Sequence, residues 1–368
     1  MDGKAKFSGE QLRMARLAHG LSLEELGEQV AATRQFIHQL ETGARSPSDE
    51  MANALADVLA VRAEFLSATV PSTVRPEQCH FRGHITRPAS ITSQVLARGT
   101  ILDSMVSALE REINLPLVNF PDVSVEGPED IERAAEEARQ HWSLGAGPIT
   151  SMMRVVENAG AIVTYFGDLS ERVDAFSMDR ARPIIVRSSL KQSACRQRFD
   201  LAHECGHLIM HRGIQTGDRL TEEQAHRFAS AFLLPRAAAL RELPRGRTIQ
   251  WQKLYELKLR WKVSVRALIR RGYDLGMYSA AQYRTANIHM AKTGQSKSER
   301  YDDHPALPIE QPELLPSALS VLEREGPGIH ELMAKAGISE ATFERVTGLP
   351  CPFRRLGALP ENVVPLRR

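Results

Sequence analysis

Two histidines four residues apart, His203 and His207, constrain the fold of this 368-residue chain more than any other feature. On an α-helix they lie one turn apart on one face, so both imidazole rings can bind a single metal ion such as zinc. Glu204 would face the open side of that ion, where it can take a proton from a bound water. The neighbouring residues Phe199, Leu201, Ala202, Leu208 and Ile209 are apolar. We therefore predict a buried helix at the floor of a cleft, with Glu204 as the catalytic residue. The alternative is a pair of core histidines.

A catalytic zinc site needs a third protein ligand and leaves its fourth position to water. Residues 221–235 have apolar residues at helical spacing and end in Pro235, which predicts a second amphipathic helix. Glu222 and His226 lie four residues apart on one face of that helix. We predict Glu222 as the third ligand and His226 as a residue that supports a ligand by hydrogen bonding. Two alternatives remain open, namely Glu223 or His226 itself as the ligand.

Other residues are candidates for roles near such a site. His211 lies four residues after His207, and we expect it to support a ligand or the helix end. Tyr165 and His211 are also candidates for stabilising an oxyanion. If residues 182–189 form the edge of the cleft, an extended substrate would pair with them by strand addition.

Short segments rich in β-branched and aromatic residues precede the histidines. A predicted helix at 149–160 is followed by predicted strands at 161–166, 173–178 and 182–189. From about residue 197 to residue 283 the apolar spacing is helical. The middle of the chain is therefore expected to combine a small sheet with several helices.

Residues 8–66 indicate short helices separated by tight turns. Ser22 and Glu25 have the spacing of a capping box, and a second helix is expected to begin near Thr33 and to end before Gly43. Such a pair of helices can place the start of the second helix in a DNA major groove. The predicted DNA-binding residues are Thr33, Arg34, Gln35, His38 and Arg45.

The first domain is acidic overall. Residues 1–66 contain seven lysines and arginines against ten aspartates and glutamates, a net charge of −3. A DNA-binding surface would have to concentrate its few cations, here Arg34 and Arg45, with Lys4 and Lys6 as further candidates. A helical protein-interaction domain is the alternative.

Two resemblances sharpen these expectations. The stretch LSLEELGEQVAATRQFIHQLETGARSPS resembles the XRE (lambda-repressor-like) helix-turn-helix family, most specifically in ETGARSPS. The resemblance implies a five-helix unit that binds operator DNA, commonly as a dimer. Ala31 departs from the family, which usually has glycine in this turn.

The stretches RQRFDLAHECGHLIMH and EEQAHRFASAFLLP resemble the ImmA/IrrE family of gluzincin-like zinc metallopeptidases, and the similarity covers about residues 150–240. It implies that His203, His207 and Glu222 bind zinc and that the enzyme cleaves a regulatory protein, frequently a repressor. His226 stands where the family has aspartate or asparagine. Cys205 replaces a commonly aliphatic residue and would make the site sensitive to oxidation if it were exposed.

Two later segments carry weaker signals. Residues 251–277 are basic and amphipathic, and their apolar stripe favours a packing helix pair over a nucleic-acid contact. Residues 329–350 have the outline of a second helix-turn-helix, for which a docking or sensing role is at least as well supported as DNA reading.

Composition sets broad limits. The net charge of +2 gives no overall attraction to nucleic acid or anionic lipid. No apolar run is long enough to span a bilayer, and the first residues lack the apolar core of a signal peptide, so we expect a cytoplasmic protein. The four cysteines, Cys79, Cys195, Cys205 and Cys351, are scattered and are expected to be reduced thiols.

Together these patterns predict a mainly α-helical protein with a small β-sheet. The expected parts are a DNA-binding domain at 1–68, a helical connector at 69–147, a zincin-like domain at 148–283, an exposed linker at 284–314 and a C-terminal sensing or docking module at 315–368.

The expected function is transcription regulation coupled to zinc-dependent cleavage of a partner repressor, which would control stress-response or mobile-element genes. The expected partners are operator DNA, bound through residues 1–68 of a homodimer, and the protein substrate, with no membrane contact. The alternative is a non-proteolytic DNA-binding or antitoxin-like regulator whose zinc domain is a sensor or docking surface.

Overall fold

The computed structural model describes residues 6–69, 72–81, 88–166, 175–188 and 193–351, together with the backbone of a short strand at 364–365. The described part is mainly α-helical with a small sheet, as the sequence predicts. Lys4 and most of the chain after residue 351 lie outside the described residues. Among the described helices, none is both long and apolar enough to cross a membrane.

The described residues from 8 to 67 form the predicted five-helix unit, in which the last member is a 3₁₀ helix. Its elements are α1 (Gly9–His19), α2 (Leu23–Gln29), α3 (Arg34–Glu41), α4 (Asp49–Val58) and η1 (Ala63–Ser67). The predicted capping box is present, because Glu25 N donates to Ser22 Oγ at 3.1 Å and Ser22 N donates to Glu25 Oε2 at 2.7 Å. The turn between α2 and α3 keeps a left-handed residue even without glycine, with φ of 53° at Ala31.

The segment expected as a helical connector contains helices, as predicted, and it also contributes residues to both hydrophobic cores. Its elements are η2 (Pro76–Gln78), β1 (Cys79–Phe81), α5 (Ala89–Leu109), β2 (Ile113–Asn114) and α6 (Pro128–His141). Helix α5 packs on α1, where the buried Arg98 donates to the Ala18 carbonyl at 2.8 Å. Helix α6 packs instead on a helix of the second half of the molecule, α9 (Arg219–Leu233).

A four-stranded sheet lies at the centre of the molecule, in the order β1-β4-β5-β3. The three predicted strands are present as β3 (Ile162–Tyr165), β4 (Phe176–Met178) and β5 (Ile184–Arg187), and β1 is an additional edge strand. Strand β5 pairs with β3 in parallel and with β4 antiparallel, so it is internal. The hypothesis that residues 182–189 form a cleft edge for substrate pairing is therefore wrong.

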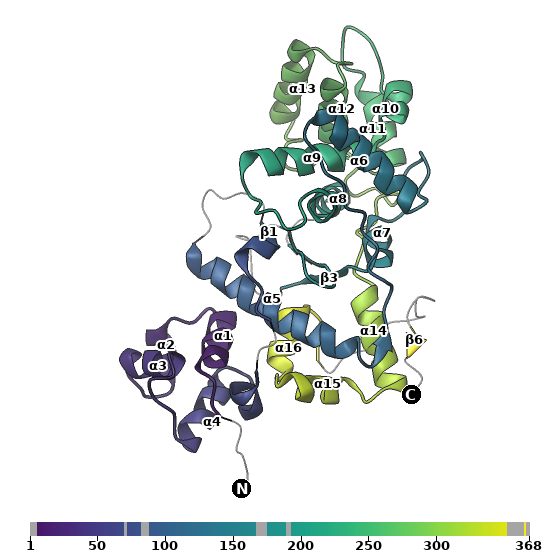
Figure 1. The fold of residues 1–368 in the computed structure, drawn as a ribbon. Coiled ribbons are helices and arrows are strands. Elements are labelled where there is room, and N and C mark those ends of the chain that lie inside the picture. The colour runs from purple at the N-terminus through teal and green to yellow at the C-terminus, as the bar shows by residue number, and fades with distance from the viewer. Residues whose placement is uncertain are drawn as a thin grey trace.

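The two faces of the sheet pack into two different hydrophobic cores, because successive side chains of a strand point to opposite faces. Ile162, Ile184 and Val186 belong to a core shared with α1, α5 and the C-terminal helices. Val163 and Ile185 belong to a core shared with α7 (Met152–Asn158), α8 (Ala194–Met210) and α9. Figure 1 shows α8 on one side of the sheet and α5 on the other.

Four further helices extend the second core. They are α10 (Arg236–Glu242), α11 (Trp251–Trp261), α12 (Val265–Asp274) and α13 (Ala280–Lys292). Most of the predicted apolar stripe of residues 251–277 is buried, with Leu254, Trp261, Val265, Leu268 and Ile269 at most 1% exposed. The packing role expected for this pair of helices is confirmed.

Residues 293–313, here called the strap, are mostly exposed, as the sequence indicated for a linker, but several of their acidic side chains bind the second half of the molecule. Glu299 is 6% exposed and accepts a hydrogen bond from the buried Lys258 Nζ at 3.0 Å, and Asp302 accepts a second from the same atom at 2.7 Å. Glu310 accepts from the Met153 backbone at the start of α7 at 2.7 Å and pairs with the buried Arg198. The strap is therefore fastened to the second half of the molecule by its acidic side chains.

The C-terminal helices do not stand apart from the first domain. They are α14 (Leu314–Glu325), α15 (Ile329–Ala336) and α16 (Glu340–Thr347), followed by β6 (Val364–Pro365), which pairs with β2. The Arg62 backbone donates to the Gly337 carbonyl at 2.8 Å, and the Thr342 hydroxyl donates to the Ala60 carbonyl at 2.7 Å. The five-helix unit therefore packs on both α5 and the C-terminal helices (Figure 1).

Candidate metal centre and nucleic-acid interface

Helix α8 brings His203 and His207 together at the centre of the molecule. Both side chains are 1% exposed, and their Nε2 atoms lie 3.1 Å apart. This proximity follows from the four-residue spacing on one helical face. Helix α9 packs against α8, so side chains of both helices can meet at this face.

Glu222 completes this cluster from α9. Its carboxylate oxygens lie 3.5 Å from His203 Nε2 and 3.4 Å from His207 Nε2. Asp218 caps the start of α9 by accepting hydrogen bonds from the backbone of Leu220 and Thr221, and Glu222 lies in the first turn of this helix. Among the described residues, these three alone form a histidine, cysteine or carboxylate group compact enough for a metal.

The cluster fits the donor set and dimensions of a zinc site. A tetrahedral site with metal–ligand bonds of about 2.0–2.1 Å has ligand atoms about 3.3–3.4 Å apart, close to the separations observed here. Glu222 Oε1 is buried and accepts no hydrogen bond from any described residue. Burial raises the pKa of Glu222, but the side chains of His203 and His207 lower it by more, so the net pKa lies well below its usual range. An anionic ligand facing two imidazoles is suited to a divalent cation.

The other two candidate ligands lie elsewhere on α9. Glu223 is exposed and lies outside the cluster. His226 is also exposed, and its ring packs against the rings of His203 at 5.6 Å and Phe199 at 4.8 Å. His226 therefore contacts a residue of the cluster through its ring rather than joining the group of ligand atoms.

His211 adjoins the cluster at the end of α8. Its Nδ1 lies 2.9 Å from His207 Nδ1, and its Nε2 lies 2.8 Å from the Gln224 side-chain oxygen. Burial and the neighbouring His207 lower the pKa of His211 to about 4, which favours the neutral ring. This chain of contacts orients His207 so that its Nε2 faces Glu222.

Glu204 lies beside the cluster with a 1% exposed side chain. The Ser177 hydroxyl of β4 donates a hydrogen bond to Glu204 Oε2 at 2.7 Å. Tyr165 lies elsewhere, where its hydroxyl contacts the Gln311 side chain at 3.3 Å, so the structure does not bring this candidate oxyanion donor to the cluster. Cys205 is fully buried, and burial raises the pKa of its thiol, so the exposure on which the expected sensitivity to oxidation depended is not present.

His80 is a neighbour that the sequence analysis missed. It lies on β1 directly opposite Ser177, and its ring stacks on His207 with centroids 5.1 Å apart and planes 5° apart. Its Nδ1 lies 2.9 Å from Thr216 Oγ1, and burial lowers its pKa to about 2. No described residue forms a hydrogen bond with its Nε2. A three-residue strand more than a hundred positions before the HExxH motif gives no sequence signal of this contact.

The candidate nucleic-acid interface is the exposed start of α3. The Phe36 backbone donates to the Thr33 side chain at 3.2 Å, which caps the helix, while Ile37 and Leu40 are buried. Four of the five candidate residues, Thr33, Arg34, Gln35 and His38, are exposed on α3 or at its cap, and Arg45 is exposed in the following turn. The predicted outward face is thus free of core packing.

Comparison with known families found matches for two separate stretches of the chain. Residues 9–66 match the family model described as a helix-turn-helix domain. Residues 156–272 match the model described as an IrrE N-terminal-like domain of the M78 peptidase family. A comparison with curated protein sequences gave no match. Strand β1 and the C-terminal helices α14–α16 lie outside both matched stretches.

Proposed function

From a chain that carries a helix-turn-helix domain and an IrrE N-terminal-like domain, we propose a transcription regulator with a zinc-dependent endopeptidase site. The observation that carries this proposal is the convergence of His203, His207 and Glu222 beside Glu204. Zinc would be held by the two Nε2 atoms and the Glu222 carboxylate. When bound, it would supply Lewis-acid activation of the scissile carbonyl and of a water molecule.

The remaining steps belong to the side chains of the chain itself. Glu204 would accept the proton of the attacking water and then deliver it to the leaving amine. Ser177 would hold the Glu204 carboxylate in place through its 2.7 Å hydrogen bond. His211 would fix the tautomer and orientation of His207, as ligand-supporting residues commonly do.

The substrate we propose is a protein, most plausibly a partner repressor of stress-response or mobile-element genes. The argument is the fusion itself, because the helix-turn-helix domain would bring the peptidase site to operators in the cytoplasm. Arg34, Gln35 and His38 would contact base edges, Thr33 would cap the recognition helix, and Arg45 would contact phosphate. Two-fold operator binding by a homodimer follows from the XRE resemblance alone.

The test of the peptidase is incubation of purified protein with candidate repressors encoded nearby. We expect cleavage by the wild type, none by Glu204→Gln, and unchanged cleavage by the matched control Glu223→Gln, with zinc content equal in all three. If Glu204→Gln cleaves at the wild-type rate, the proposed base is wrong. If all three bind zinc and none cleaves any candidate, the non-proteolytic sensor is favoured.

The test of DNA binding is an operator shift assay. Arg34→Ala combined with Gln35→Ala should abolish the specific shift, since each bidentate base contact contributes about 1–3 kcal/mol of discrimination. Arg13→Ala, an exposed arginine on α1, is the control and should bind as the wild type. Unchanged specific binding by the double variant would refute the assignment of α3 as the recognition helix.

A further inference from the structure

Charge is distributed very unevenly along this chain. Residues 236–292, from the start of α10 to the end of α13, contain 13 lysines and arginines but only three aspartates and glutamates, a net charge of +10. The whole chain has a net charge of +2, so the remaining residues carry a net charge of −8. A region this basic within an otherwise acidic chain must either neutralise its cations internally or present them to an anion.

Internal neutralisation accounts for only part of this charge. Arg271 pairs with Glu132 of α6, and Lys258 pairs with the strap. Glu242 and Asp274 pair with arginines of the same region. Seven other cations are exposed and have no ion pair with any described residue. These residues, here called the basic surface, are Arg236, Arg245, Arg247, Lys253, Arg266, Arg284 and Lys292.

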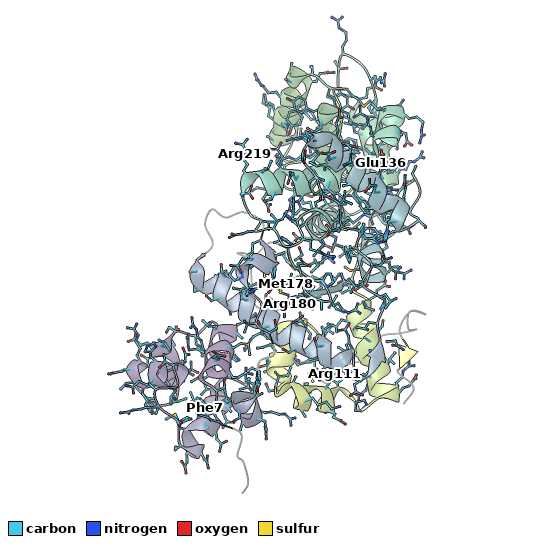
Figure 2. The ribbon with its side chains drawn as sticks, viewed as in Figure 1. Phe7, Arg111, Glu136, Met178, Arg180 and Arg219 are labelled. Atoms are coloured by element: carbon cyan, nitrogen blue, oxygen red, sulfur yellow. The ribbon has the colours of Figure 1, made fainter. Side chains whose placement is uncertain are left out.

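The contacts between these helices place several members of the basic surface close together. Gln282 Nε2 donates to the Gly246 carbonyl at 2.8 Å, which holds the loop carrying Arg245 and Arg247 against the start of α13. At the other end of α13, the ring of His289 packs on Trp251 with centroids 4.3 Å apart. Figure 2 shows nitrogen-tipped side chains projecting into solvent around this end of the molecule.

Aromatic faces lie among these cations. Tyr273 is 37% exposed and stacks on Tyr283 with ring centroids 4.6 Å apart. Both line an open groove of about 520 Å³ together with Arg284 and with Ile288, which is 49% exposed. Exposed aromatic rings beside arginines are the combination that stacks nucleic-acid bases while the cations contact phosphates. The neighbouring helix α6 is acidic, with Glu136 labelled in Figure 2, and it limits the surface on that side.

We propose that the basic surface binds the phosphate backbone of nucleic acid without sequence preference, and that the groove with Tyr273 and Tyr283 takes unpaired bases. This contact is separate from α3, which lies at the opposite end of the molecule (Figure 1). It gives the chain a second nucleic-acid site on the peptidase side. The proposal requires neither a bound metal nor peptide cleavage.

The experiment uses the full chain with Arg34→Ala and Gln35→Ala, which removes the proposed base contacts of α3. This parent is titrated into labelled duplex and single-stranded oligonucleotides of random sequence at several salt concentrations, with fluorescence anisotropy as the readout. The test variant adds Arg245→Glu and Arg284→Glu. The matched control adds Arg75→Glu and Arg111→Glu, two exposed arginines outside the basic surface, of which Arg111 is labelled in Figure 2. Equal melting temperatures confirm that the variants fold.

The parent and the control should bind, and the test variant should bind at least about tenfold more weakly. The slope of log affinity against log salt should fall by about 2 in the test variant, since each phosphate contact contributes about 0.9 for duplex DNA. Adding Tyr273→Leu to the parent should weaken its binding to the single-stranded oligonucleotide about tenfold and leave its binding to the duplex unchanged.

Three outcomes would overturn the proposal. They are a parent that binds neither oligonucleotide, an equal loss of affinity in the test and control variants, and a parent that binds anionic phospholipid vesicles but no nucleic acid. If Tyr273→Leu weakens binding to the single-stranded and the duplex oligonucleotides equally, the groove does not take unpaired bases.

Discussion

The hydroxyl of Ser177 lies 2.7 Å from Glu204 Oε2 and donates a hydrogen bond to it across the space between strand β4 and helix α8. On the adjacent strand His80 stands opposite Ser177 and stacks on His207. One pair of facing sheet residues thus contacts both the proposed base and a proposed ligand. The sheet therefore contacts the Glu204 and His207 side chains of α8 directly, in addition to packing in the core.

Replacing Ser177 with alanine should reduce peptide cleavage about tenfold to a hundredfold. A hydrogen bond to a charged group contributes about 1.5–3 kcal/mol, and its loss would leave the Glu204 carboxylate free to rotate. Zinc content should stay at the wild-type level because no proposed ligand changes. Thr164→Ala, on the opposite face of the sheet, is the control. Full activity of Ser177→Ala would show that α8 alone positions the base.

Glu222→Ala should lower zinc affinity by more than about a hundredfold, since it removes one of three ligands. Glu223→Ala removes the adjacent exposed carboxylate from the same helix and should leave zinc affinity unchanged. Metal analysis after dialysis against a chelator of known affinity measures both. If Glu223→Ala lowers zinc affinity and Glu222→Ala does not, Glu223 is the third ligand.

Ala31→Gly should raise the free energy of unfolding by about 0.5–1 kcal/mol. Ala31 has φ of 53°, a left-handed conformation that is strained for alanine and unstrained for glycine, and this relief exceeds the entropy that glycine adds to the unfolded chain. Ala44→Gly is the control, since Ala44 is an exposed loop residue whose φ is not positive. Chemical denaturation compares them, and equal destabilisation by both would contradict the prediction.

Glu157→Gln should change the pH dependence of stability. Burial raises the pKa of Glu157 from 4.5 to about 8, although the Glu313 and Leu314 backbones donate to its carboxylate. The folded protein therefore binds more protons than the unfolded chain between these two values. The contribution of Glu157 to the free energy of unfolding is therefore fully present below pH 4.5 and is lost as pH rises through about 8.

Glutamine cannot ionise, so the variant does not lose this stability as pH rises. The free energy of unfolding of Glu157→Gln minus that of the wild type should therefore increase with pH, by up to about 1.4 kcal/mol per pH unit across this window. Urea denaturation at a series of pH values gives the difference. Glu325→Gln, which changes an exposed acid of α14, is the control variant for the loss of a glutamate. A constant difference for Glu157→Gln would refute the assignment.

Local patterns in the sequence predicted much of this molecule. The capping box at Ser22, the helix start at Thr33 and the three central strands depend on short-range spacing and appear where expected. The four-residue spacing of His203 and His207 likewise fixed their proximity, because helix geometry alone determines it. Glu222 could be predicted to meet these histidines on the single assumption that α9 packs against α8.

Features that depend on distant contacts were missed or misread. Strand β1 has three residues and is stabilised by pairing with β4, so its sequence carries no strand periodicity of its own. The strap has a polar composition typical of a linker, yet Glu299 and Glu310 are ordered by partners more than forty residues away. The polar composition predicted the exposure of most strap residues but could not show that a buried cation and a helix start elsewhere in the chain bind two of its acidic side chains.

The sheet with a different core on each face has a consequence for dissecting this protein. A fragment cut to residues 156–272, the stretch that matches the peptidase family, would lose β1, α5 and α14 and would expose Ile162, Ile184 and Val186 to water. Such a fragment should aggregate rather than fold. The sheet is therefore a wall common to two cores, and removing the elements on one side leaves an apolar face of the other side in water.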